Sequence, residues 1–253
     1  MIGIFDSGIG GLSVFKEIIK LLPSENYIYY SDNAHCPYGN KSNEYIIDRA
    51  RYITTLLIEK GAEIIVIACN TATSAAIKTL REEFDLPFVG MEPAVKPASF
   101  ATKTGVVGVL ATEGTLKGEK YHHSCDEYAK GVKIVEHIGE GFVELVEKGI
   151  LTGDIAEDCI RKSIDPIIGE GADIIVLGCT HYPFLKEAIT KLAGDKIQII
   201  DPSPAVARRV LELRNQNKTD IKNNIEASTS LNIILLSSGD DSSLKRCFKS
   251  LAI

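Results

Sequence analysis

The sequence has no run of about 18 apolar residues, so it predicts no membrane-spanning helix. Its first residues, Met1 to Asp6, contain no basic segment followed by an apolar one, and we expect no secretory signal peptide. There is no excess of positive charge either, because 28 Lys and Arg stand against 34 Asp and Glu, a net charge of -6. This balance gives no electrostatic attraction to nucleic acid or to an anionic membrane, and we expect neither as a partner.

Paired cysteines are also lacking. The six cysteines in 253 residues include no Cys-x-x-Cys pair and no spacing typical of a small disulfide-linked domain. Free thiols are typical of a reducing compartment, so we expect a cytoplasmic protein. The glycines Gly8, Gly10 and Gly11 do not have the G-x-G-x-x-G spacing of a dinucleotide-binding loop. They predict instead a backbone that approaches a small ligand closely.

The chain alternates short apolar runs rich in β-branched residues with longer amphipathic stretches. This alternation favours βαβ units and parallel sheets, and therefore the α/β fold class. The expected strands are 2–5, 27–31, 63–67, 88–90, 105–110, 132–136, 173–177, 197–200 and 231–236. The expected helices lie near 10–22, 43–60, 71–83, 115–129, 141–149, 153–169, 183–192, 204–214 and 241–250. The polar stretch 215–228 predicts a loop.

Parts of the chain occur twice. Segment 61–69 aligns without a gap with segment 171–179, a shift of 110 positions, and both read Gly-Ala-acid-Ile-Ile-Val before ending in cysteine. Weaker matches join 93–95 to 204–206, a shift of 111, and 3–7 to 108–112, a shift of 105. Three matches in the same order predict two similar α/β domains. We place the first domain at 1–95 plus 208–253 and the second at 96–207.

Cys69 and Cys179 end the two copies, where an apolar strand is followed by a helix. Open α/β sheets bind ligands at the carboxyl ends of their strands, and helix N-termini favour anions. We therefore expect a lowered pKa for both thiols and a bound carboxylate beside them. Racemisation requires such a pair, because one group removes a proton from one face of a carbon and another returns a proton to the opposite face.

Five segments resemble the glutamate racemases of the aspartate/glutamate racemase family. They are Ile4 to Gly11, Pro37-Tyr38-Gly39, Ala68 to Thr73, Glu92-Pro93-Ala94 and Leu177 to Pro183. The resemblance extends from the first residues to about Ala207. The Cys-Thr-His segment at 179–181 is similar to glutamate racemases, whereas aspartate racemases tend to have Cys-Thr-Glu. Two segments depart from the family pattern, 201–204 and 137–139.

The resemblance implies two pseudo-symmetric domains with the active site in the cleft between them. It implies racemisation of L-glutamate to D-glutamate for peptidoglycan synthesis, with no pyridoxal phosphate and no metal. Cys69 would take the α-proton from D-glutamate with the help of Asp6. Cys179 would take it from L-glutamate with the help of His181 and Glu147. The implied substrate contacts are Asp6-Ser7, Tyr38-Gly39, Asn70-Thr71 and Thr180-His181, and homodimers are frequent in the family.

Three alternatives remain open on the residues alone. A racemase for aspartate or another amino acid would use the same two thiols. A cysteine hydrolase or transferase would pair Cys179 with His181 but leave Cys69 without a role. A metal-binding protein would need three or four closely spaced ligands, which this spacing does not supply. The cysteines and histidines outside these motifs are expected to be structural or at the surface.

Overall fold

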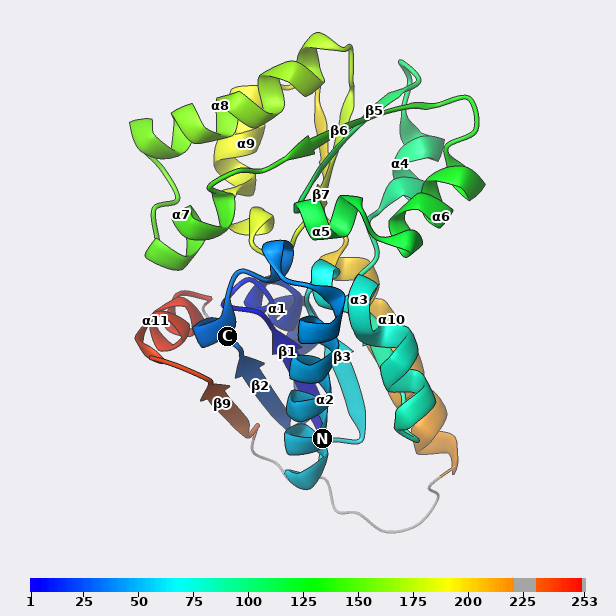
Figure 1. Ribbon diagram of the computed structural model, residues 1–253, viewed down its shortest axis with the longest axis vertical. Helices are drawn as coiled ribbons and strands as arrows, with labels where there is room; N and C mark the ends of the chain where they lie inside the picture. The colour runs from blue at the N-terminus through cyan, green and yellow to red at the C-terminus, as the bar shows by residue number, and fades with distance from the viewer. Residues whose placement is uncertain (221–230, 252–253) are drawn as a thin grey trace.

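The computed structural model describes residues 1–220 and 231–251. It contains two parallel β-sheets, each with helices packed on both faces, stacked along the longest axis of the molecule (Figure 1). The first strand and the last strand and helix all lie in the lower half, at the blue and red ends of the colour scale (Figure 1). This two-domain arrangement confirms the α/β fold class.

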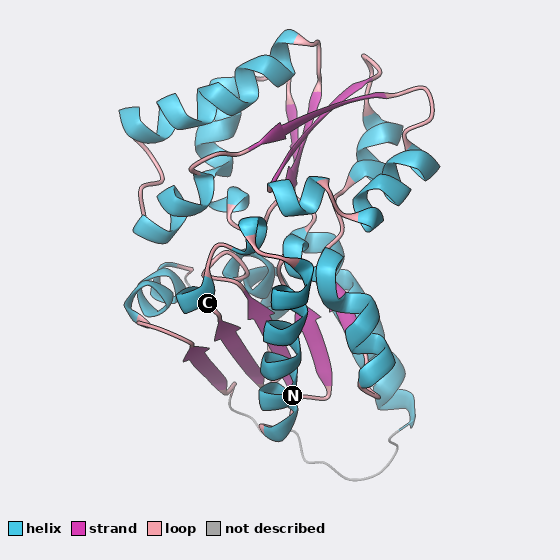
Figure 2. Ribbon diagram, in the orientation of Figure 1, coloured by secondary structure: helices cyan, strands magenta, loops and turns pink. Residues whose placement is uncertain are grey.

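The elements in the described residues follow the expected alternation (Figure 2). The strands are β1 (Ile2–Asp6), β2 (Tyr27–Ser31), β3 (Ile64–Ile67), β4 (Phe88–Gly90), β5 (Val106–Ala111), β6 (Lys133–Ile138), β7 (Ile174–Gly178), β8 (Gln198–Ile200) and β9 (Ile233–Ser237). The α-helices are α1 (Leu12–Leu21), α2 (Asn43–Glu59), α3 (Asn70–Glu83), α4 (Val95–Ala101), α5 (Glu113–Leu116), α6 (Glu119–Tyr128), α7 (Phe142–Lys148), α8 (Asp154–Gly169), α9 (Lys186–Ala193), α10 (Ser203–Asp220) and α11 (Ser242–Ser250). Short 3₁₀ helices are η1 (Asn33–His35), η2 (Tyr38–Asn40) and η3 (Tyr182–Leu185). Within the described ranges, none of the helices has the length and apolar character needed to cross a membrane.

The two sheets repeat one strand order. The first sheet runs β4-β3-β1-β2-β9 and the second runs β8-β7-β5-β6, with neighbouring strands parallel throughout. Ile2 pairs with Ile64 in the first sheet, and Val107 pairs with Ile174 in the second, so the register repeats as well. These pairs are related by the same shifts that the sequence shows, which confirms two similar, pseudo-symmetric domains. The exact domain boundaries stay a prediction.

Alternation along the strands distributes the core over both faces of each sheet. In β1, Ile4 packs with residues of α1 and α10, whereas Phe5 packs with residues of α2 and α3. Burial on both faces explains the unbroken apolar runs of these strands. The cluster on the α1 side continues into the second domain, where it includes residues of α7, α8 and α9. The two domains therefore share one apolar core on that side.

Three local features differ from the sequence-based expectations. The helix expected at 115–129 is interrupted because Gly118 has an extended backbone, and a Cβ there would lie 1.9 Å from Oγ of Ser74. Helix α4 was not expected; it is short and tolerates Pro97 because the N–H groups of a first helical turn need no partner within the helix. The loop expected at 215–228 is wrong at its start, since α10 continues to Asp220, and positions 221–228 lie outside the described residues.

Candidate active site

A small cavity of about 20 Å³ lies where the carboxyl ends of β3 and β7 approach each other. Cys69 follows β3 and Cys179 follows β7, so both thiols line this one cavity. The lining residues are Ser7, Pro37, Tyr38, Gly39, Cys69, Asn70, Thr71, Thr112, Val143, Cys179, Thr180 and His181. A space of this size holds about one water molecule. A ligand the size of an amino acid therefore enters only when the walls separate.

Cys69 caps helix α3. Its Sγ accepts the N–H of Ala72 at 3.4 Å and lies 3.9 Å from Oγ of Ser7. Burial raises the pKa of Cys69 and the nearby Asp6 raises it further, and the helix N–H does not offset them. The lowered pKa expected for this thiol is therefore wrong for the closed state, because removal from water outweighs the partial charge of the helix terminus. In the state that the structure shows, Cys69 is therefore a protonated thiol.

Cys179 begins a chain of three side chains. Its Sγ lies 3.9 Å from Nδ1 of His181, and Nε2 of His181 lies 2.7 Å from Oε1 of Glu147. Burial alone would lower the pKa of His181, but its bonds to Cys179, Cys36 and Glu147 prevail and hold that pKa well above its usual value. Burial likewise opposes ionisation of Glu147, yet the bond to His181 brings the pKa of Glu147 below its usual value. The pair is therefore an imidazolium and a carboxylate next to a thiol.

Asp6 lies behind the cavity wall at the end of β1. Its buried carboxylate accepts the N–H of Gly11 at 2.8 Å and that of Gly8 at 3.4 Å, and the hydroxyl of Thr180 lies 3.5 Å away. Burial raises the pKa of Asp6 more than the neighbouring His181 lowers it. A carboxyl group with a raised pKa exchanges protons closer to neutral pH. Asp6 is also near enough to raise the pKa of Cys69.

The glycine turn after β1 fits around side chains of the second domain. A Cβ at Gly8 would lie 2.1 Å from Oε1 of Glu147, and a Cβ at Gly10 would lie 2.3 Å from Nδ1 of His181. The N–H of Ile9, between them, donates to Oε1 of Glu147 at 2.9 Å. The close approach that the structure shows at these glycines is to His181 and Glu147, and an approach to a small ligand stays a prediction.

Asn70 offers the cavity an unpaired polar group. The residue is 4% exposed, and neither Oδ1 nor Nδ2 finds a hydrogen-bond partner among the described residues. A buried polar atom without a partner costs about 1–3 kcal/mol. A polar ligand in the cavity would remove that cost. Of the predicted substrate contacts, Ser7, Tyr38, Gly39, Thr71, Thr180 and His181 line the cavity with Asn70, whereas Asp6 does not.

Tyr38 is anchored by a buried ion pair. Its hydroxyl donates to Oδ2 of Asp32, and Asp32 is fully buried. Arg49 donates to both oxygens of Asp32, at 2.7 and 3.0 Å, and its guanidinium lies 4.9 Å from the ring centre of Tyr52. A bidentate arginine fixes the orientation of a carboxylate. The pair therefore holds Tyr38, and with it the neighbouring Gly39, against the cavity.

The variant Tyr38→Phe should loosen this wall. We expect its free energy of unfolding to fall by about 1–3 kcal/mol, because a buried carboxylate loses a donor. We also expect KM for the substrate to rise several-fold with a smaller change in kcat, since binding must then order the wall. Urea denaturation and steady-state kinetics measure both. Tyr52→Phe is the matched control, because Tyr52 is 53% exposed; equal losses in both variants would refute the anchoring role.

Cys36, Thr112 and Val143 lie at the site and were missed by the sequence reasoning. Cys36, expected to be structural or at the surface, lies with its Sγ 3.9 Å from Oε1 of Glu147. Its only signal is its place directly before Pro37-Tyr38-Gly39. Thr112 lines the cavity, and its Oγ1 lies 2.9 Å from Oγ1 of Thr71. The repeat identifies Thr112, because Thr112 is the counterpart of Ser7 at the shift of 105.

Known glutamate racemases are similar in sequence to this protein along most of the chain. A glutamate racemase of Ectopseudomonas mendocina (strain ymp) is 48% identical over 218 residues, covering 86% of this chain and 83% of the relative. One from Herpetosiphon aurantiacus is 48% identical over 212 residues, 84% of each chain.

Solved structures extend the similarity to the fold. A glutamate racemase isoform from Bacillus anthracis matches with a TM-score of 0.86 and 29% identity over 100% of this chain and 93% of that chain. Escherichia coli glutamate racemase, in complex with L-glutamate and the activator UDP-MurNAc-ala, matches with a TM-score of 0.86 and 35% identity, covering 99% and 93%. The family model described as Asp/Glu/Hydantoin racemase matches residues 2–210. With two matched domains and two cysteines facing one cavity, the chain belongs to the Asp/Glu/Hydantoin racemase family.

Proposed function

We propose that this protein interconverts L- and D-glutamate, with Cys69 and Cys179 as the two proton carriers and no cofactor. The observation that carries the proposal is that these thiols end equivalent strands of the two domains and line one cavity. Two groups on opposite sides of one carbon are the requirement of a two-base racemisation. A single-nucleophile hydrolase would leave Cys69 without a role.

The reaction needs one thiolate and one thiol. Starting from L-glutamate, the Cys179 thiolate takes the α-proton and leaves a carbanion. Cys69 then gives its own proton to the opposite face, which yields D-glutamate, a Cys179 thiol and a Cys69 thiolate. The raised pKa of Cys69 means that this thiol carries the proton that it gives up. Reversal of both transfers converts D-glutamate to the L-enantiomer.

Neighbouring groups support each thiol separately. The imidazolium of His181, held by Glu147, stabilises the Cys179 thiolate. Asp6 takes up the proton when Cys69 must act as the base. Asn70, Thr71 and Thr180, with Ser7, Tyr38 and Gly39, would bind the polar groups of the substrate.

Glutamate is proposed because the relatives at 46–48% identity over most of this chain are glutamate racemases. The structure from Francisella tularensis is a complex with D-glutamate, at 28% identity and a TM-score of 0.82. The product would serve peptidoglycan synthesis.

We also propose a cytoplasmic location, a homodimer, and domain boundaries after residues 95 and 207. Light scattering of the purified protein tests the dimer.

Incubation of metal-free protein with L-glutamate in deuterated water tests the function. We expect the circular dichroism of the amino acid to decay to zero while the Cα proton signal disappears from the NMR spectrum at a matching rate. L-aspartate in a parallel reaction should change far more slowly. Faster conversion of aspartate would replace the substrate, and a trapped thioester without exchange at Cα would favour the hydrolase.

A further inference from the structure

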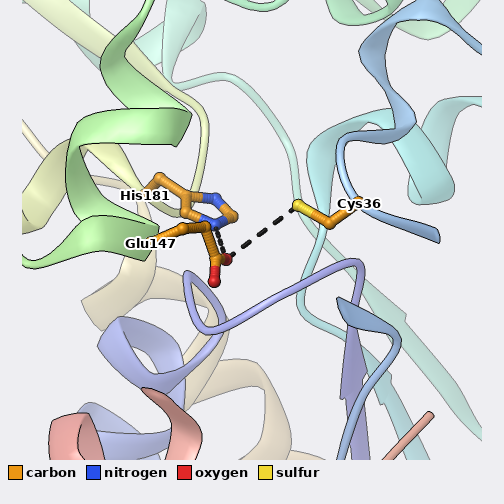
Figure 3. Close-up of side chains that lie close together, drawn as sticks. All are labelled: Cys36, Glu147 and His181. Carbon is orange, nitrogen blue, oxygen red and sulfur yellow. Dashed lines mark hydrogen bonds and ion pairs between the residues drawn. The ribbon is translucent and has the colours of Figure 1, made fainter. Parts of the chain in front are cut away.

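Three potential metal ligands from the two domains converge beside the cavity. Cys36 lies between η1 and η2 of the first domain, whereas Glu147 on α7 and His181 after β7 belong to the second (Figure 3). Their ligand atoms all lie within 4.8 Å of one another. Among the side chains that the structure describes, no other group of three from His, Cys, Asp or Glu meets this condition. The proposed reaction uses Glu147 and His181 but assigns no role to Cys36.

The chemistry of the three donors fits a thiophilic divalent cation. Thiolate, imidazole and carboxylate are the ligands of zinc, and three protein ligands with an open fourth position form a common zinc site. Around a tetrahedral zinc ion such donors are about 3.3–3.6 Å apart. Here Sγ of Cys36 is 3.9 Å and Nε2 of His181 is 2.7 Å from Oε1 of Glu147. Small side-chain rotations would therefore complete the geometry.

An ion has access to this cluster without entering the closed cavity. His181 is 2% exposed, but the Glu147 side chain is 22% exposed and Cys36 is only partly buried. Figure 3 shows Cys36 on one side of the carboxylate and His181 on the other. A cation between them would replace the contact of Nε2 with Glu147 and would connect the two domains.

We propose that Cys36, Glu147 and His181 form a site for Zn²⁺ or a similar thiophilic cation, and that its occupation inhibits the enzyme. The inhibition rests on the proposed function, whereas the binding does not. The bound metal takes the Nε2 lone pair of His181 and releases protons from the ligands. His181 then no longer supports Cys179 as it does when paired with Glu147. The link between Cys36 and His181 also resists the domain separation that substrate entry requires.

Cobalt titration of the metal-free full-length protein tests the binding directly. We expect Co²⁺ to give a thiolate-to-cobalt charge-transfer absorption that saturates at one equivalent and is abolished by Zn²⁺. Cys36→Ala should remove this absorption, and Glu147→Gln should weaken Co²⁺ binding at least tenfold. Cys159→Ala is the matched control, because Cys159 is a partly exposed cysteine on α8 whose Sγ donates to the carbonyl of Glu140.

The activity arm measures racemisation of glutamate against added Zn²⁺. The Zn²⁺ concentration for half inhibition should rise at least tenfold in Cys36→Ala and stay unchanged in Cys159→Ala, with EDTA restoring activity. Absorption that survives in Cys36→Ala but is lost in Cys69→Ala would place the metal on the cavity thiols and overturn the proposal. Far-UV circular dichroism checks that each variant is folded. If no racemisation occurs in any variant, the cobalt absorption still decides the metal site.

Discussion

Replacing either cavity cysteine with alanine is expected to lower the rate of glutamate racemisation by about 10³-fold or more, because one face of the substrate loses its only proton carrier. The two variants should differ in the exchange that remains. Cys69→Ala keeps Cys179 and should exchange the α-proton of L-glutamate alone, whereas Cys179→Ala should exchange that of D-glutamate alone. NMR in deuterated water, starting from each pure enantiomer, separates the two results.

A serine at each position provides the control for folding. Cys69 caps α3 through the N–H of Ala72, and a serine hydroxyl keeps a cap where alanine loses about 0.5–2 kcal/mol. Cys69→Ser should therefore unfold at nearly the native temperature and still be inactive, since a hydroxyl is a much weaker acid than a thiol. Interconversion at the native rate in any of these variants would refute the two-thiol assignment.

The variant Gly10→Ala is expected to lower kcat by about 10²-fold or more, the usual scale for loss of acid–base assistance. Its Cβ would lie 2.3 Å from Nδ1 and 2.7 Å from Cγ of His181, so the imidazole must leave the position that places Nδ1 3.9 Å from Sγ of Cys179. Because the proposed mechanism assigns His181 to Cys179 alone, exchange at L-glutamate should fall more than exchange at D-glutamate. Initial exchange rates from each enantiomer measure this asymmetry.

Gly169→Ala is the matched control for the glycine substitution. Gly169 ends α8, and an added Cβ there meets nothing within 4 Å. This variant should retain native kcat and stability, while Gly10→Ala should also lose about 1–3 kcal/mol through overpacking. An unchanged kcat in folded Gly10→Ala would show that the position of His181 does not limit the reaction.

The strands were predictable because they are buried on both faces and read as apolar runs. Segments such as 64–67 and 174–177 fall within predicted strands, and their duplication indicated two similar domains. Features set by contacts between distant segments were not predictable in this way. The break at Gly118 depends on the approach of Ser74 from another helix, and no local pattern in 115–129 contains that contact.

In the candidate site, too, the sequence identified residues but not the properties that depend on contacts between distant segments. Most residues lining the cavity follow strand ends, and motifs identified most of them, including Asn70 and Thr180. The pKa of Cys69 could not be inferred from its place at a helix terminus, because it depends on how completely the closed domains exclude water. Cys36 was missed because its nearness to Glu147 arises only when the two domains meet.

The hydrogen bond from the N–H of Ile9 to Glu147 joins the first domain to the Glu147–His181 pair beside Cys179, so both domains contribute to this part of the site. If the two domains separate to admit an amino acid, the N–H of Ile9 and the glycine turn both move away from Glu147 and His181. In the proposed mechanism, an open molecule would bind the amino acid but would lack the support for removing its α-proton. In that mechanism, the carbanion would therefore form only while bulk solvent is excluded, and water would not protonate it from the wrong face.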